Sequence, residues 1–328
     1  MPTQKLPVLS IFCVSFIYTL KTWILEKCFP VIALTGISGI GKTTLAVKLI
    51  QQIKDNFDYV IWRSLKKTSN FAEFQADLIE FFSQSQPQNF LKNRHKPLDL
   101  IKYLQKHHCL VVLDNIHNLF SSGELAGKYK PGYEEYDYFF QQIEKLSHQS
   151  CLLLIGWEPI KLLQLKSKKT IIPILQLTGL DIKSAKEILI NYGLAKIEHS
   201  EKLIHLYQGN PLWLKIVATQ IQELEESLIE LLPSDIILLP EYLKDNLQQQ
   251  CDRLSQAEKY TLSLLATKNQ PISLAKLLET TETSPSALLN ILQSLCRRSL
   301  IEKQENLYSL PSILKEYYTE NKFTLNIV

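Results

Sequence analysis

Short apolar runs alternate with amphipathic stretches between residue 31 and about residue 175. The runs are rich in leucine and β-branched residues, and this alternation is typical of a parallel sheet covered by helices on both faces. Pro173 lies in the last run and places that strand at an edge of the sheet. The predicted strands are 31–35, 59–63, 109–113, 151–155 and 171–177.

One helix is predicted between the first two strands. Leu45, Leu49, Ile50 and Ile53 recur at helical spacing and would form its buried face. The helix begins inside a glycine-rich loop, so this part of the chain is expected to read strand, loop, helix.

After Leu177 the pattern changes to helices. Asp181 is a plausible N-cap for a helix over 182–192, and Gly193 is a C-terminal stop. A small helical domain is expected to continue to about residue 238.

The last section has clear helix-start signals. Residues 255–258 form a capping box, Ser273 begins a short helix, and Pro285 follows Ser284 at a first helical position. Strands are predicted at 299–301 and 307–310, joined by a polar turn over 302–306. Three helices, a hairpin and a last helix predict a winged helix.

The N-terminal segment 6–20 is apolar and is flanked by Lys5 and Lys21. A spanning helix needs about 20 apolar residues, and this run is shorter and interrupted by polar residues and a proline. We therefore expect a folded strand or helix, with membrane association as the alternative. The predicted domains are the N-terminal segment 1–30, a sheet domain 31–177, a helical domain 178–238 and a winged-helix domain 239–328.

Composition restricts the possibilities only weakly. The chain has 328 residues, 45% hydrophobic and 21% charged, with a formal net charge of +3. This charge falls short of that expected of a dedicated nucleic-acid binder. The six cysteines lack a CxxC pair and are interpreted as small buried hydrophobic residues in a reduced compartment. The histidines lack metal-ligand spacing.

The most specific motif is Gly36-Ile-Ser-Gly39-Ile40-Gly41-Lys42-Thr43, which matches the phosphate-loop pattern. Glycines let the backbone point successive amides at an anion, lysine places a charge on the phosphates, and the threonine hydroxyl coordinates magnesium. The motif predicts binding of ATP or ADP with Mg²⁺. A glycine turn without a ligand is the alternative.

Asp114 supports this interpretation, because it ends the apolar strand that begins at Cys109. A carboxylate at the carboxyl end of such a strand holds the magnesium water shell in phosphate-loop folds. The predicted fold class is therefore an α/β P-loop NTPase with a parallel sheet, followed by the helical and winged-helix domains.

Further segments resemble the NB-ARC ATPases of the STAND signalling class. These segments are the loop followed by Thr44-Leu-Ala46, residues 113–116, and Gly209-Asn-Pro211-Leu with its helix. Residues 123–133 and 147–151 are similar to bacterial NB-ARC proteins that usually carry WD repeats downstream. The resemblance covers about residues 10–320, and no WD or helical repeat follows residue 320.

The resemblance implies a nucleotide held between the three domains, and a closed form that opens when ATP replaces ADP. Pro211 would then pack against the adenine, although a proline at a helix start explains the same residue without a ligand. The resemblance also implies a cytoplasmic protein whose ATPase units self-associate when activated. The implied nucleotide-binding residues are Gly36, Gly39, Ile40, Gly41, Lys42, Thr43, Thr44 and Pro211; Thr43 and Asp114 would hold the metal, and Asp114 and Asn115 are the catalytic positions.

Four departures from the family bear on hydrolysis. Asp114 stands at the family's Walker B aspartate, at the end of the strand 109–113. Asn115 replaces the acidic residue that usually follows it, and an amide can position water but cannot accept its proton. Trp157 stands near the position of the family's sensor arginine and cannot replace a bidentate cation. Segment 12–17 lacks the family's arginine, and Leu310-Pro311-Ser312 lacks its histidine.

These observations favour a nucleotide switch that hydrolyses ATP slowly or not at all, with its sensor or effector supplied by a protein partner in trans. A non-catalytic scaffold is the first alternative. The second is a DNA-binding transcription regulator. Helix 285–298 argues against it, because its first turns carry Ser286, Ala287, Leu288 and Leu289 instead of basic or amide residues.

Overall fold

The computed structural model describes residues 11–67, 70–84, 97–160, 172–194, 200–223 and 236–320. The chain forms two compact units. The first, the sheet unit, contains Lys21–Gly36 and Lys42–Gln176; the second, the C-terminal unit, contains Ile37–Gly41, Leu177 onward and the described residues up to Leu20. The predicted helical and winged-helix domains both fall in the C-terminal unit, and the boundary between them stays a prediction.

The sheet unit is built on five parallel strands in the order β2-β3-β4-β1-β5. β5 lies at an edge, as Pro173 predicts. β2 and β3 each end one residue later than predicted, and β5 is shorter than its predicted range. The strands are β1 (Val31–Thr35), β2 (Tyr59–Ser64), β3 (Cys109–Asp114), β4 (Cys151–Ile155) and β5 (Ile174–Gln176).

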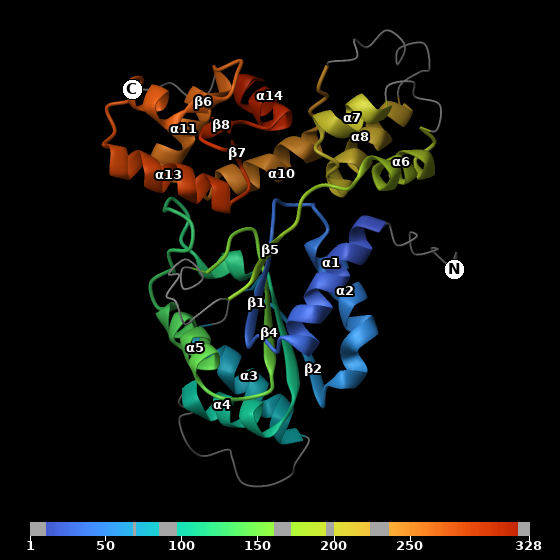
Figure 1. The fold of residues 1–328 in the computed structure, drawn as a ribbon, viewed down its shortest axis with the longest axis vertical. Coiled ribbons are helices and arrows are strands. Elements are labelled where there is room, and N and C mark those ends of the chain that lie inside the picture. The colour runs from blue at the N-terminus through green and yellow to red at the C-terminus, as the bar shows by residue number, and fades with distance from the viewer. Residues whose placement is uncertain are drawn as a thin grey trace. The chain divides into compact units, whose positions relative to one another are not determined.

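Helices cover both faces of this sheet (Figure 1). The amphipathic helix α2 (Lys42–Ile53) lies on one face, and it is the helix that the leucine and isoleucine spacing predicts. On the other face, α3 (Phe71–Gln84), α4 (Pro97–Lys106) and α5 (Glu134–Lys145) enclose the aromatic core. This core packs against the strands and fixes their positions. Their carboxyl ends lead into loops.

The strand register aligns the carboxyl ends of β2, β3, β4 and β1 at one edge of the sheet. Asp114 of β3 pairs with Ser64 of β2 on one side and with Ile155 of β4 on the other. Leu34 of β1 in turn pairs with Ile155. Because the loop to α2 leaves β1 at this edge, the same edge receives the glycine-rich loop and Asp114.

The N-terminal apolar segment is helical where it is described. α1 (Ile11–Lys21) is followed by a short π-helical turn, η1 (Thr22–Glu26). Residues 6–10 of the predicted segment lie outside the described residues. Within the described ranges, no helix has both the length and the apolar character needed to cross a membrane. Cys28 is exposed, so the prediction of burial is wrong for this cysteine.

The C-terminal unit is mainly helical, and four of its described helices begin at the predicted caps. Asp181 accepts the Ser184 amide at 2.9 Å, and Ser255 forms a capping box with Glu258. The helices are α6 (Ile182–Asn191), α7 (Ser200–Leu206), α8 (Pro211–Glu223), α10 (Glu241–Cys251), α11 (Gln256–Ala266), α12 (Leu274–Leu278), α13 (Pro285–Arg297) and α14 (Ser312–Glu320).

A small antiparallel sheet of β6 (Ile272–Ser273), β8 (Leu307–Ser309) and β7 (Glu302–Gln304) lies among these helices. The prediction of a strand at 299–301 was wrong, because the strand begins at Glu302. β7 is an edge strand with all three residues exposed, so its polar residues resemble a turn in sequence. The order of helices, hairpin and last helix is the one predicted for a winged helix.

Two glycines allow the chain to cross itself before α8. Leu180 donates its amide to the Gly209 carbonyl at 2.9 Å. A Cβ on Gly179 would lie 1.6 Å from the Gln208 carbonyl oxygen, and Gly209 has a φ of 61°. The crossing fixes the turn that carries Asn210 and Pro211.

We expect Gly179→Ala to destabilise the C-terminal unit by about 1–3 kcal/mol or more, because overpacking forces the backbone of the turn to move. Urea unfolding followed by circular dichroism measures the change. Gly123→Ala is the matched control, since Gly123 has a φ of 78° and open space around it, so only backbone strain is added. Equal losses in the two variants would contradict close packing at Gly179.

Candidate functional site

The candidate site is the glycine-rich loop between β1 and α2. Gly39 and Gly41 have φ values of 78° and 102°, which side-chain-bearing residues rarely adopt. A Cβ on Gly41 would meet nothing within 4 Å, whereas one on Gly39 would lie 2.6 Å from Leu212. Both glycines are therefore required by conformation, and Gly39 also by the close approach of α8.

Lys42 is buried at the first position of α2, with 8% of its surface exposed. Its Nζ donates a hydrogen bond to the Gly36 carbonyl at 2.8 Å. Burial lowers the pKa of Lys42 to about 7, and the Asp114 carboxylate opposes that shift. The loop thus holds the Lys42 side chain in a buried place, where a bound anion would stabilise its charged form.

Thr43 and Asp114 meet across the loop, where the Thr43 hydroxyl donates to Asp114 Oδ2 at 3.1 Å. Burial raises the pKa of Asp114, while the bonds from Thr43 and from the Asn115 amide, followed by Lys42, lower it. A hydroxyl and a carboxylate are the hard oxygen ligands that Mg²⁺ uses with phosphates. The donor set therefore fits the predicted metal, and the assignment of Thr43 and Asp114 as its ligands stays a prediction.

Asn115 follows Asp114 in the left-handed conformation, with a φ of 64°. Its amide proton goes to Asp114 Oδ1 at 2.8 Å, and its side-chain Nδ2 donates to the Ser64 hydroxyl at 3.3 Å. Asparagine is one of the few residues that tolerates this conformation. The two predicted catalytic positions therefore both lie at the carboxyl end of β3, and Asn115 reaches Ser64 at the end of β2.

Trp157 stacks on His117 with ring centroids 4.0 Å apart and planes at 6°. His117 lies in η3 (Ile116–Leu119), directly after Asn115. A Cβ on Gly156 would lie 2.5 Å from Ile116, so the chain after β4 passes close to this helix. Sequence reasoning missed His117, because nothing in its spacing indicates a partner forty residues away.

Other predicted residues lie in the C-terminal unit or on the surface. Pro211 begins α8 beside Asn210, whose side-chain Oδ1 accepts the Leu212 amide at 3.0 Å. The structure thus shows the helix-start role of Pro211, and its contact with adenine stays a prediction. Ile40 is buried and Thr44 is exposed on α2.

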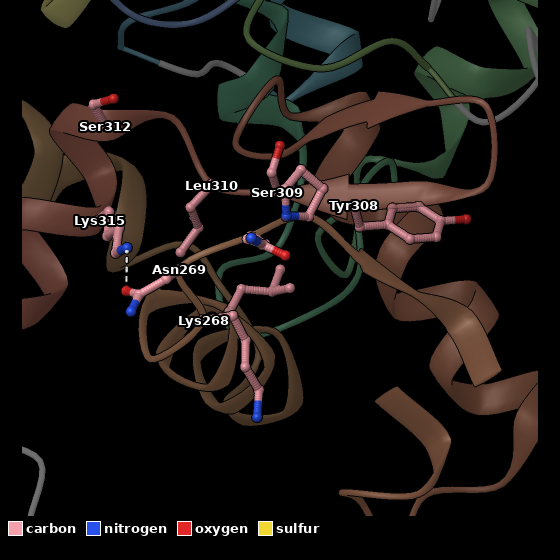
Figure 2. A pocket seen from close by; sticks show the side chains of 10 residues that line it. Lys268, Asn269, Tyr308, Ser309, Leu310, Ser312 and Lys315 are labelled. Atoms are coloured by element: carbon pink, nitrogen blue, oxygen red, sulfur yellow. Dashed lines mark hydrogen bonds between the residues drawn. The ribbon is translucent and has the colours of Figure 1, made fainter. Parts of the chain in front are cut away.

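Leu310-Pro311-Ser312, which lacks the family's histidine, lies at a small pocket of about 250 Å³ in the C-terminal unit (Figure 2). Lys315 is turned toward Asn269, to whose Oδ1 its Nζ donates at 3.1 Å. The Lys268 side chain extends away from Leu310 in Figure 2. The lining cations therefore do not converge on one point as they would around a phosphate.

Comparisons with known proteins agree with this geometry. Residues 16–122 match the NB-ARC domain family. An uncharacterized WD repeat-containing protein of Nostoc sp. is 34% identical over 321 residues, which are 92% of this chain and 25% of the relative. A probable disease resistance protein of Arabidopsis thaliana is 28% identical over 102 residues, 29% of this chain and 14% of the relative. The chain thus spans a quarter or less of the length of these relatives.

Among solved structures, the Walker-type ATPase of Pyrococcus abyssi is similar to the fold of this chain. The TM-score is 0.64 at 15% identity, and the alignment covers 95% of this chain and 97% of the other.

The parallel sheet, the glycine loop before α2 and the Thr43–Asp114 pair together define a P-loop protein of the nucleotide-binding NTPase class. Within that class, residues 16–122 match the NB-ARC domain family.

We expect ADP affinity to fall as the pH rises above 7. Lys42 is partly neutral there, so phosphate binding must take up a proton, and affinity then drops by up to about tenfold per pH unit. Isothermal titration calorimetry between pH 6.5 and 9 measures this slope. Lys42→Arg should flatten it, because arginine stays protonated. The same flat profile in the wild type would contradict the lowered pKa.

Proposed function

We propose that this chain is a STAND-type nucleotide switch that binds ADP or ATP with Mg²⁺ and hydrolyses ATP slowly. The observation that carries the proposal is an intact binding set beside an altered catalytic set. Lys42 donates to the loop carbonyl of Gly36, and Thr43 donates to Asp114. Asn115 and Trp157 stand where the family resemblance would put an acidic residue and the sensor arginine.

The proposal of nucleotide binding rests on the charge of Lys42 and on the loop backbone. The Lys42 ammonium is held inside the loop, where a phosphate can replace the Gly36 carbonyl as its partner. Bound Mg²⁺ would neutralise phosphate charge, and Thr43 and Asp114 would hold it. Charge-assisted contacts of this kind are the strong ones in phosphate recognition.

The proposal of slow ATP hydrolysis rests on Asn115. A general base must accept a proton from the attacking water, and a carboxamide has no such capacity at neutral pH. Its Nδ2 is instead directed to the Ser64 hydroxyl, and Asp114 is engaged by Thr43 and the Asn115 amide. The site can therefore retain nucleotide without turning it over rapidly.

Trp157 supports the same proposal. Its indole stacks on His117, which follows the Walker B strand, and presents no bidentate donor to a γ-phosphate. A site that lacks this cation should distinguish ATP from ADP weakly. Discrimination would then have to come from other parts of the protein.

The switch would act in signalling in the cytoplasm. Its sensor or effector would be a repeat domain or a partner protein. The WD repeats named in the Nostoc relative are one such module. Self-association on nucleotide exchange is part of this proposal. The surface of α13 supports packing over DNA binding, because Ser286, Ala287 and Leu289 are exposed there and Arg298 is buried against Glu258.

The direct test is binding of ADP and ATP with Mg²⁺ to the purified chain. Lys42→Ala should weaken binding by about ten- to a hundredfold, because one hydrogen bond to a charged group contributes about 1.5–3 kcal/mol. Lys48→Ala, on the same helix, is the control and should bind as the wild type does. Negligible binding by all three proteins would reject the proposed function.

We also expect Asn115→Asp to raise ATP turnover by about a hundredfold or more, since it supplies the missing base. Aspartate tolerates the left-handed conformation, so the fold should be kept. Phosphate release under saturating Mg-ATP measures the rate, with Asn118→Asp in η3 as the matched control. A fast wild-type rate that Asn115→Asp leaves unchanged would contradict the role assigned to Asn115.

A further inference from the structure

Ser38 of the phosphate loop is hydrogen-bonded through its amide, its carbonyl and its hydroxyl. Its backbone amide donates to Gln250 Oε1 at 3.1 Å, and its carbonyl accepts from Asn210 Nδ2 at 2.9 Å. Its hydroxyl accepts from Asn246 Nδ2 at 2.9 Å. We call Asn210, Asn246 and Gln250 the amide clasp. Ser38 and the clasp all belong to the C-terminal unit.

Each amide of the clasp is fixed in orientation by a second partner. Asn210 is fully buried, and its Oδ1 accepts the amides of Leu212 and Trp213 at the start of α8. These N–H groups can only donate, so Nδ2 must face Ser38. Asn210 thus caps α8 and also donates a hydrogen bond to the Ser38 carbonyl of the loop.

The two amides on α10 are fixed in the same way. Asn246 Oδ1 accepts from the Trp213 indole at 3.2 Å, and an indole N–H is a donor only. Gln250 Nε2 donates to the Asn246 carbonyl at 3.3 Å, which leaves its Oε1 for the Ser38 amide. A network with every member satisfied is rigid, because any change of orientation leaves a buried polar group unpaired.

Packing closes the loop against the same elements. Leu212 of α8 approaches Gly39 so closely that a Cβ there would lie 2.6 Å from Leu212 Cβ and 3.0 Å from Asn210 Oδ1. The loop therefore cannot move at Ser38 or Gly39 without disturbing α8 and α10. The clasp side chains are amides and their partner Ser38 carries a hydroxyl, so pH does not change the charge of any of these groups.

We propose that the amide clasp is a positioning device that holds the phosphate loop at Ser38 and thereby slows the release of bound nucleotide. This inference rests on the proposed function, because it concerns nucleotide in the same loop. The clasp residues act through Ser38 and not by contact with the phosphates. Loss of one clasp bond should loosen the loop without removing Lys42 or Thr43.

The test uses two variants that each remove one bond. Gln250→Leu removes the acceptor of the Ser38 amide, and Ser38→Ala removes the hydroxyl that Asn246 binds. Gln249→Leu is the control for the first, because Gln249 is exposed on the same helix. Ser38→Thr is the control for the second, because it keeps the hydroxyl. Melting curves establish that all four proteins fold.

Two measurements follow on each protein. Hydrogen–deuterium exchange of the nucleotide-free protein reports the loop amides, and stopped flow reports release of a fluorescent N-methylanthraniloyl ADP with Mg²⁺. We expect both rates to rise about three- to tenfold in the clasp variants, the size of effect of one neutral hydrogen bond. Both rates should stay at wild-type values in Gln249→Leu, and in Ser38→Thr they should lie closer to the wild type than in Ser38→Ala.

Unchanged loop exchange would overturn the clasp, and so would faster exchange with unchanged or slower ADP release. If the wild type does not bind the labelled ADP at all, the proposed function fails. The exchange measurement then still decides whether the clasp holds the loop.

Discussion

The contact on which the site depends is the hydrogen bond between Thr43 and Asp114 at 3.1 Å. It exists because β1 and β3 are parallel and end at the same edge of the sheet, with β4 between them in register. A slip of one residue in β3 would turn the carboxylate to the other face of the sheet. The apolar core that fixes the register therefore also fixes the distance between the two predicted metal ligands.

The loop makes two kinds of contact, each within one of the two units. On the side of α2, Lys42 is buried and bonded back to Gly36, which stores a cation where a phosphate can bind. At Ser38, uncharged amides from α8 and α10 bind the loop backbone. Charge thus provides attraction for the ligand, and the amide network provides rigidity, because neutral amides orient a loop without competing for the anion.

Local chemistry explains which parts could be predicted from sequence. The caps at Asp181 and Ser255 are determined by residues within a few positions of each other, and the structure confirms them. The loop and Asp114 were predicted from local motifs, and the structure brings Asp114 into contact with Thr43. β7 was misplaced because an exposed edge strand needs no apolar residues. The His117–Trp157 stack and the clasp on Ser38 join residues 40 to 212 positions apart. Asparagine, glutamine and aromatic residues are common, and no spacing marks such pairs, so only the fold reveals them.

We propose that the phosphate loop holds one nucleotide and retains it. Native mass spectrometry of the wild-type chain, exchanged into volatile buffer after incubation with excess Mg-ADP, tests this most directly. We predict that most of the protein carries the added mass of one ADP and that a similar incubation with Mg-ATP leaves mainly unhydrolysed ATP bound after minutes. A spectrum of ligand-free protein after saturating ADP would contradict the account.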